Sequence, residues 1–214
     1  MYYWVVLFFL LVMACLSECL DHLNLLFVRH GESAANADPE CRFEQGYIDD
    51  LVRLSPKGQI QAIKLGESLP NQDVQFWSSP MHRAIETTSL LIQNTETHSF
   101  IVDKRLKELE WPWFANEASR LRHKNEMKKV GMLTYTNSNL GTFECGQDVV
   151  SRLQEFMLDH LDELNKQSNI IVCHEIVMRA FYYMITGDPA DFENKKFDNC
   201  ETLHWKGDVE NLWW

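Results

Sequence analysis

The sequence predicts an α/β fold, a three-layer sandwich in which helices cover both faces of a mostly parallel central sheet. Short apolar runs alternate with longer amphipathic stretches along the chain, which is the pattern of strands connected through helices. The 214 residues contain no internal repeat and no linker rich in Pro, Gly or Ser, so one domain accounts for most of the chain. With 45% hydrophobic residues, this domain can bury a full core.

The first half of the chain predicts three strands and two helices. The continuous apolar run over 23–29 predicts a buried strand, and short runs at 74–77 and 100–102 predict two more. A helix over 55–69 is indicated by the capping residue Ser55, by Pro56 in the first turn and by a rough apolar face. Pro80 marks the start of a second helix over 81–93.

The second half begins with a polar segment that is weakly helical over 117–130. We interpret the region of about 111–145 as an insertion that covers one end of the sheet. The pattern beyond it predicts a long amphipathic helix, a buried strand, another helix and a last strand, which cover 148–166, 169–173, 176–185 and 202–205.

The first residues of the chain differ from the rest. Residues 1–16 contain no charged residue, no Gly and no Pro, and the first basic residue is Arg29. This run is shorter than the roughly 20 apolar residues that cross a bilayer, and it suits the apolar region of a signal peptide. We predict an apolar leader over 1–20, either a signal peptide or a membrane anchor, before a domain over 21–214; a buried first element is the alternative. A leader favours the secretory pathway or a membrane, with the cytoplasm as the alternative.

The composition limits the partners of the protein. A net charge of −11 repels nucleic acid and anionic membranes, so we expect no nucleic-acid partner and membrane contact only through an uncleaved leader. A phosphorylated ligand would need a few local cations. The six cysteines form no C-x-x-C pair and no His-rich spacing that would mark a zinc site. The sequence leaves a homodimer open.

Three predicted strands end in cationic or imidazole-bearing segments. Arg29 and His30 follow the first strand, Arg83 lies shortly after the second, and His174 follows the strand over 169–173. In a parallel sheet, ligands bind beyond the carboxyl ends of the strands, so these side chains should converge. Two arginines can clamp a phosphoryl group, and a neutral imidazole can attack its phosphorus atom. Gly31 would let the backbone approach the ligand closely.

A leaving alkoxide needs a proton, so a carboxylic acid should lie at the same edge. Glu108 and Glu110 follow the third predicted strand and are the two candidates. Apolar neighbours such as Trp111 would raise the pKa of such a carboxyl toward neutrality.

Four motifs resemble the histidine phosphatase superfamily, and the first resembles its phosphoglycerate mutase-like branch. The similarity extends over about 23–205. The motifs are F-V-R-H-G-E-S-A-A-N at 27–36, L-S-P-K-G-Q-I-Q-A at 54–62, S-S-P-M-H-R-A-I-E-T-T at 78–88 and V-C-H-E at 172–175.

The resemblance implies roles for individual residues. It makes His30 the residue that is phosphorylated and Glu108, rather than Glu110, the proton donor. The phosphate pocket that it implies consists of Arg29, Arg83, His174 and Asn36, with Ser33 and Gly31 as further substrate contacts. The implied activity is phosphoryl transfer through a phosphohistidine, with no metal or other cofactor. We favour hydrolysis of a small phosphomonoester, because the insertion is shorter than we would expect in a dedicated glycolytic mutase and a leader suits such a mutase poorly.

Two positions depart from the family pattern. Cys173-His174-Glu175 stands where the family commonly has S-H-G, and Gly146-Gln147-Asp148 stands where it often has G-E-S before the long helix. A carboxylate at Glu175 is favourable at the start of a helix, but it would repel phosphate if it pointed into the pocket.

Other functions fit the sequence less well. Cys173 and Arg179 have the C-x5-R spacing of cysteine-based phosphatases, but the intervening residues include no glycine and favour a helix. The absence of a P-loop motif excludes a bifunctional kinase–phosphatase. A mutase-type phosphotransferase and a non-catalytic protein that binds a phosphorylated ligand are the alternatives to a phosphatase.

Overall fold

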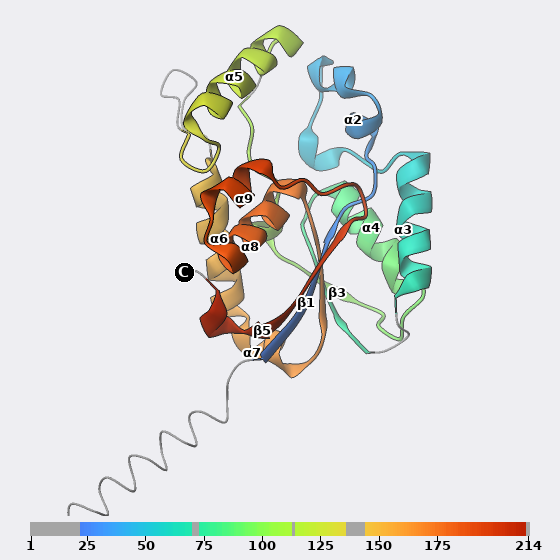
Figure 1. Ribbon diagram of the computed structural model, residues 1–214. Coiled ribbons are helices and arrows are strands. Elements are labelled where there is room, and N and C mark those ends of the chain that lie inside the picture. The colour runs from blue at the N-terminus through green and yellow to red at the C-terminus, as the bar shows by residue number, and fades with distance from the viewer. Residues whose placement is uncertain (1–21, 70–72, 113, 136–143, 213–214) are drawn as a thin grey trace, which may run out of the picture.

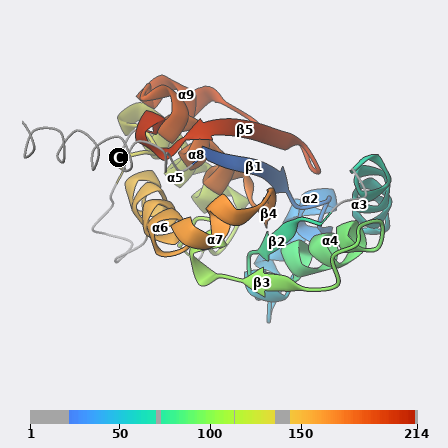
Figure 2. The ribbon, with the colours of Figure 1, turned by 90° about the horizontal axis from the view of Figure 1, so that it is seen from below.

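The computed structural model describes residues 22–69, 73–112, 114–135 and 144–212. A five-stranded sheet in the order β3-β2-β4-β1-β5 forms the centre of the molecule, with helices on both faces (Figures 1 and 2). Three parallel pairings join the first four strands, and β5 is antiparallel to β1. This confirms the predicted α/β sandwich. The strands are β1 (His22–Arg29), β2 (Gln75–Ser78), β3 (Phe100–Val102), β4 (Asn169–Cys173) and β5 (Thr202–Asp208).

Alternation along β1 divides the core into two layers. Leu23, Leu25 and Phe27 are fully buried on the face covered by α6 (Gly146–Asp159) and α8 (Glu175–Thr186). Val28 lies on the opposite face, which is covered by α3 (Pro56–Ser68) and α4 (His82–Ile92). The sheet therefore holds its position through apolar contacts on both sides, as a mostly parallel sheet requires.

The predicted start of α3 is confirmed. Ser55 is the N-cap residue, and its side chain accepts a hydrogen bond from the backbone N–H of Gly58 at 3.1 Å. Pro56 occupies the first turn. The same serine hydroxyl donates to Glu32 Oε1 at 2.9 Å, so the start of α3 is tied to the loop that follows β1.

The prediction of one long helix over 148–166 is wrong, because the structure contains two helices in this region. α6 ends at Asp159, α7 spans Leu161–Lys166, and His160 between them has φ −111° and ψ 16°. The His160 ring lies 3.0 Å from Arg105 Nη2 and 3.2 Å from Asp103 Oδ2, and it packs on Trp77. These contacts come from distant parts of the chain, so the helical period could not reveal the break.

Several elements lie beyond the carboxyl end of the sheet. α2 (Ala34–Ala37) and α5 (Glu117–Val130) lie on opposite sides of this end (Figure 1). The bounds of α5 agree with the helix predicted over 117–130. The remaining short helices are η1 (Pro39–Phe43), η2 (Asp49–Leu51), η3 (Lys104–Leu106), α9 (Pro189–Asn194) and η5 (Val209–Asn211), none of which the sequence pattern predicted.

The predicted apolar leader over 1–20 lies outside the described residues. Within the part of the chain that the structure describes, no helix is both long and apolar enough to cross a bilayer. The boundaries of the leader and of the insertion over about 111–145 stay predictions.

Candidate active site

The carboxyl ends of β1, β4 and β2 meet at one edge of the sheet. The backbone N–H of His30 donates to Cys173 O at 3.0 Å, and that of Ser79 donates to Val172 O at 3.0 Å. Because β4 lies between β1 and β2, His174 lies between the other two strand ends. The His30 and His174 ring centroids are 5.1 Å apart. The predicted convergence of these segments is therefore observed.

The contacts of His30 determine which of its ring nitrogens carries the proton. Its side chain is buried, and Nδ1 lies 2.7 Å from Gly31 O. Because a carbonyl oxygen can only accept, Nδ1 carries the proton and Nε2 presents its lone pair. Arg83 Nε lies 3.3 Å from His30 Nε2. Burial, and then the Arg83 charge, lower the pKa of His30 well below its usual range, which keeps the ring neutral.

His174 is fully buried beside this pair. Its Nε2 lies 2.8 Å from Ser79 Oγ, whereas its Nδ1 has no hydrogen-bond partner among the described residues. Burial and the Arg83 charge also lower the pKa of His174 well below its usual range. A buried ring nitrogen without a partner is costly, so a ligand atom at this position would relieve the cost.

Asp49 holds the Arg83 guanidinium. Arg83 Nη1 donates to Asp49 O at 2.8 Å, and Nη2 donates to Asp49 Oδ2 at 3.0 Å. Arg83 is 5% exposed, so its orientation is fixed by these bonds and by burial. Asp49 belongs to η2 and to no motif, and sequence reasoning missed it.

Glu175 both starts a helix and lines the cleft. It lies in the first turn of α8, where a carboxylate is stabilised by the helix dipole. Its Oε2 lies 3.4 Å from Arg29 Nη1, and its Oε1 accepts a hydrogen bond from Arg179 Nη2. Two guanidinium groups thus offset the charge that would repel phosphate. Arg29 Nη1 also donates to Phe197 O at 2.5 Å, while its Nε has no partner among the described residues.

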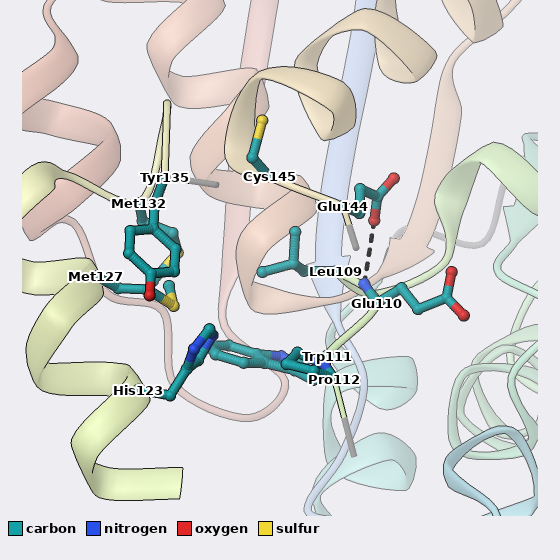
Figure 3. A pocket seen from close by; sticks show the side chains of 10 residues that line it. All are labelled: Leu109, Glu110, Trp111, Pro112, His123, Met127, Met132, Tyr135, Glu144 and Cys145. Atoms are coloured by element: carbon teal, nitrogen blue, oxygen red, sulfur yellow. Dashed lines mark hydrogen bonds between the residues drawn. The ribbon is translucent and has the colours of Figure 1, made fainter. Parts of the chain in front are cut away.

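Glu108 lies at the edge of the same cleft, beyond β3 and η3. Burial raises the pKa of its carboxyl, and the nearby Glu175 adds to this, although Arg83 and Arg29 act in the opposite direction. A raised pKa suits a group that gives up a proton during the reaction. Glu110 lines the cleft as well but is exposed, and its backbone N–H donates to Glu144 Oε2 at 3.1 Å (Figure 3).

Ser33 and Asn36 line the cleft and also cap α2. Asn36 Oδ1 lies 3.2 Å from the backbone N of Ser33 and 3.3 Å from Asn199 Nδ2. The amide oxygen of Asn36 is thus engaged in structure, and its Nδ2 group is the donor that it can offer to a ligand. Sequence reasoning did not identify Asn199.

The structure shows a packing role for Gly31, and its predicted approach to a ligand stays a prediction. A Cβ atom on Gly31 would lie 2.5 Å from Gly58 O, and the backbone N–H of Gly31 donates to Thr87 Oγ1 at 3.0 Å. Gly31 therefore packs the loop after β1 against α3 and is not among the residues that line the cleft.

The cleft has a volume of about 740 Å³ and is rich in positive charge. Its described lining includes nine lysines and arginines against six aspartates and glutamates, in a chain whose net charge is −11. Within the described ranges, no group of three or more His, Cys, Asp and Glu residues is placed to hold a metal ion. The basic residues are Arg29, Arg42, Arg83, Lys107, Arg120, Lys124, Lys128, Arg179 and Lys196.

Cys173 lies in the core beneath the site. Its side chain is fully buried in the apolar layer shared with α6 and α8, and Sγ lies 3.8 Å from His174 O. Burial raises the pKa of the thiol, which disfavours the thiolate that a cysteine-based phosphatase needs. The C-x5-R spacing with Arg179 therefore does not form a phosphate-binding loop, because residues 175–186 form α8.

We expect Cys173→Ser to leave kcat/KM for a phosphomonoester within about threefold of the parent value. A buried hydroxyl costs roughly 1–3 kcal/mol, so the free energy of unfolding should fall by about that amount. Steady-state kinetics and urea unfolding check both parts. Complete loss of activity in a variant that is folded would restore the thiolate hypothesis.

Comparison with known proteins identifies the class that this fold and site define. The sequence profile of the Histidine phosphatase superfamily (branch 1) matches residues 25–210, and the chain belongs to this superfamily. Phosphoglycerate mutase-like protein 4 of Arabidopsis thaliana is 32% identical over 94 residues, which are 43% of this chain and 39% of that protein. A 2,3-bisphosphoglycerate-dependent phosphoglycerate mutase of Corynebacterium jeikeium is 33% identical over 93 residues, or 41% of this chain and 35% of the mutase. The matched region thus spans less than two fifths of each relative.

Solved structures share the fold over most of the chain. Bacillus stearothermophilus YhfR superposes with a TM-score of 0.72 at 21% identity, covering 88% of this chain and 93% of its own. A mycobacterial glucosyl-3-phosphoglycerate phosphatase gives a TM-score of 0.67 at 21% identity, with coverage of 85% and 92%. These similarities show the phosphoglycerate mutase-like fold predicted from the motifs.

Proposed function

We propose that the protein hydrolyses a small phosphomonoester through a phosphohistidine formed on His30. The observation that carries this proposal is the state of the His30 ring. Gly31 O fixes the proton on Nδ1, and Arg83 Nε lies 3.3 Å from the unprotonated Nε2. A nucleophilic nitrogen next to a fixed guanidinium, in a cleft with an excess of basic residues, is the arrangement that phosphoryl transfer requires.

In the first step, the lone pair of His30 Nε2 attacks phosphorus and the bond from phosphorus to the ester oxygen breaks. The departing alkoxide takes the carboxyl proton of Glu108, so that a neutral alcohol leaves. In the second step, the Glu108 carboxylate takes a proton from water while the water oxygen attacks phosphorus. The bond from phosphorus to Nε2 then breaks, which releases orthophosphate and restores the neutral ring.

The other groups would stabilise the phosphoryl oxygens. Arg29 Nε and His174 Nδ1 are both buried and have no partner among the described residues, so each can bond to a phosphoryl oxygen. The guanidinium of Arg83 would balance the charge that develops next to Nε2. Asn36, through Nδ2, and Ser33 are proposed as further contacts at the edge of the cleft.

The second candidate is a mutase, which the names of the sequence relatives favour. Both activities use the same phosphohistidine. They differ in the acceptor, because a phosphatase passes the phosphoryl group to water and a mutase passes it to a hydroxyl of the bound product. A non-catalytic protein of this fold would form no phosphohistidine.

One experiment separates the three. The purified protein is incubated with phosphomonoesters labelled with radioactive phosphate, and both released orthophosphate and protein-bound label are measured. We expect a base-stable, acid-labile label on His30 and orthophosphate release equal to ester consumed. Isomeric ester without orthophosphate would assign a mutase, and neither label nor turnover would refute the enzymatic proposal.

The cellular location is a separate proposal. A signal peptide or membrane anchor over 1–20 would place the enzyme in the secretory pathway or at a membrane, and the alternative is the cytoplasm. A homodimer is a separate proposal for its assembly. Edman sequencing of the protein purified from its natural source would show whether the leader is cleaved.

A further inference from the structure

Glu108 lies on a segment that has no secondary structure of its own. Residues 107–112 follow η3 and precede α5, and they belong to no helix or strand. Among the described residues, 108–112 make no backbone-to-backbone hydrogen bond. A carboxyl group that delivers a proton needs a fixed position, so other contacts have to hold this segment.

An ion pair between Arg152 and Glu144 lies against this segment. Arg152 belongs to α6, and Glu144 lies two residues before that helix begins. Arg152 Nε donates to Glu144 Oε1 at 2.5 Å and Nη2 donates to Oε2 at 3.1 Å, so both carboxylate oxygens are held. The two side chains are 16% and 18% exposed, and at this degree of burial salt screens the pair only weakly.

The pair also binds the backbone on both sides of Glu108. Arg152 Nη1 donates to Arg105 O, three residues before Glu108. Glu144 Oε2 accepts a hydrogen bond from the Glu110 N–H at 3.1 Å, two residues after Glu108 (Figure 3). The stretch that carries Glu108 is thus fastened at both ends by one arginine and one glutamate.

Apolar packing holds the same stretch but does not orient its peptide groups. Leu106 and Leu109 are buried in the core layer that includes Val149 and Leu153 of α6. Such contacts are non-directional, so they keep the stretch on the helix without fixing how each peptide group is turned. The Leu109 N–H donates to Glu108 Oε1 at 2.8 Å, so the direction of the carboxyl group follows that of this peptide group. The backbone bonds on either side therefore decide where the carboxyl group points.

We propose that Arg152 and Glu144 are positioning residues that aim the Glu108 carboxyl group at the ester oxygen. This inference rests on the proposed function, in which Glu108 is the proton donor. Neither residue lines the cleft, so each acts through the segment that the pair holds. Proton transfer requires the donor within hydrogen-bond reach of the leaving oxygen, and a displacement of about 1 Å can lower the rate by about 100-fold.

The positive charge of Arg152 offers a second route by which this residue affects the site. After burial and the Arg83 charge, it contributes to the lowered pKa of His174. Lysine would keep this charge, but a single ammonium group cannot bind both Glu144 oxygens and the Arg105 carbonyl in the fixed geometry of a guanidinium. Arg152→Lys therefore separates the effect of charge from that of positioning.

The test compares an alkyl phosphate, whose leaving oxygen needs a proton, with p-nitrophenyl phosphate, whose leaving group departs without one. Arg152→Met and Glu144→Leu each break the pair, in the parent protein and in Glu108→Gln, and urea unfolding shows whether each variant is folded. The double variant Arg152→Met/Glu144→Leu leaves no charge without its partner, so it replaces a single variant that does not fold. The readout is kcat/KM for each ester.

Arg53→Met is the matched control. Arg53 Nη1 lies 3.2 Å from Glu86 Oε1, and Glu86 Oε2 accepts a hydrogen bond from the Leu54 N–H at 2.8 Å. The substitution therefore breaks the same kind of pair, at residues that do not line the cleft. We expect it to change kcat/KM for either ester by less than about twofold.

We expect Arg152→Met and Glu144→Leu to lower kcat/KM for the alkyl phosphate by about 10–100-fold and that for p-nitrophenyl phosphate by less than about threefold. Arg152→Lys should show most of the same selective loss. In Glu108→Gln, where the proton donor is already absent, breaking the pair should change neither ester by more than about twofold.

The outcomes separate the positioning role from the proposed function. No loss, equal losses for the two esters, a further selective loss in Glu108→Gln, full recovery in Arg152→Lys, or the same loss in Arg53→Met would each overturn the positioning role and leave the proposed function intact. Equal losses for both esters in Glu108→Gln alone, or no phosphohistidine with any ester, would instead refute the proposed function, and the positioning role with it.

Discussion

His30→Asn is expected to lower kcat/KM by about 10⁴-fold or more, since the variant cannot form the covalent intermediate. Asparagine suits this test because its amide nitrogen can still donate to Gly31 O, as His30 Nδ1 does at 2.7 Å. The loop after β1 should therefore keep its conformation while the nucleophilic nitrogen is lost. Orthophosphate release and protein-bound label, measured side by side, check the prediction.

His98→Asn is the matched control for this substitution. His98 is exposed, precedes β3 and is not among the residues that line the cleft, so the same chemical change should leave kcat/KM within about twofold. If His30→Asn kept more than about a hundredth of the activity, or still carried acid-labile phosphate, another residue would have to be the nucleophile.

Glu108→Gln is expected to lower kcat/KM by about 10²–10⁴-fold for an alkyl phosphate, whose leaving oxygen needs a proton. The loss should be much smaller for p-nitrophenyl phosphate, because nitrophenolate departs without one. Glu110→Gln, a change of the same kind two residues away, should alter neither rate by more than about twofold. Equal losses for both esters in Glu108→Gln would indicate a structural role for this residue.

The pH profile gives a second readout for Glu108. Burial lowers the pKa of His30 and raises that of Glu108, so the reactive form has a neutral ring and a protonated carboxyl. We expect kcat/KM to increase as the pH rises through the pKa of His30 and to decrease as it passes that of Glu108. In Glu108→Gln the decrease at higher pH should disappear. A profile in Glu108→Gln that matches the parent profile would argue against Glu108 as the acid.

Most of the fold follows from local pattern. The continuous apolar runs that form β1 and β4 and the capping signals at Ser55 depend on residues close in sequence, and the structure contains these elements within a residue or two of the predicted bounds. The break at His160 depends on Asp103 and Arg105, more than fifty residues away. Local periodicity carries no information about such a contact.

In the site, too, the features that depend on local sequence could be predicted, and those that depend on distant contacts could not. Residues next to strand ends could be placed together from topology alone, which is why His30, Arg83 and His174 were predicted to meet. Asp49, which fixes the Arg83 guanidinium, lies on η2, which comes between η1 and α3 in the chain and does not follow a strand. The bridge from Glu175 to two arginines depends on side-chain direction, which the residue pattern does not contain.

The two sides of the cleft, the loop after β1 and helix α5, differ in how they are attached to the sheet. His30 sits on a loop whose Gly31 packs closely against the backbone of α3, so a side chain added at Gly31 would disturb the contact between this loop and the helix. α5 instead is packed through two of its own side chains, His123 and Met127, and belongs to no layer of the sheet. Exposed residues of α5 can therefore be exchanged without altering the contacts that hold His30 at the end of β1.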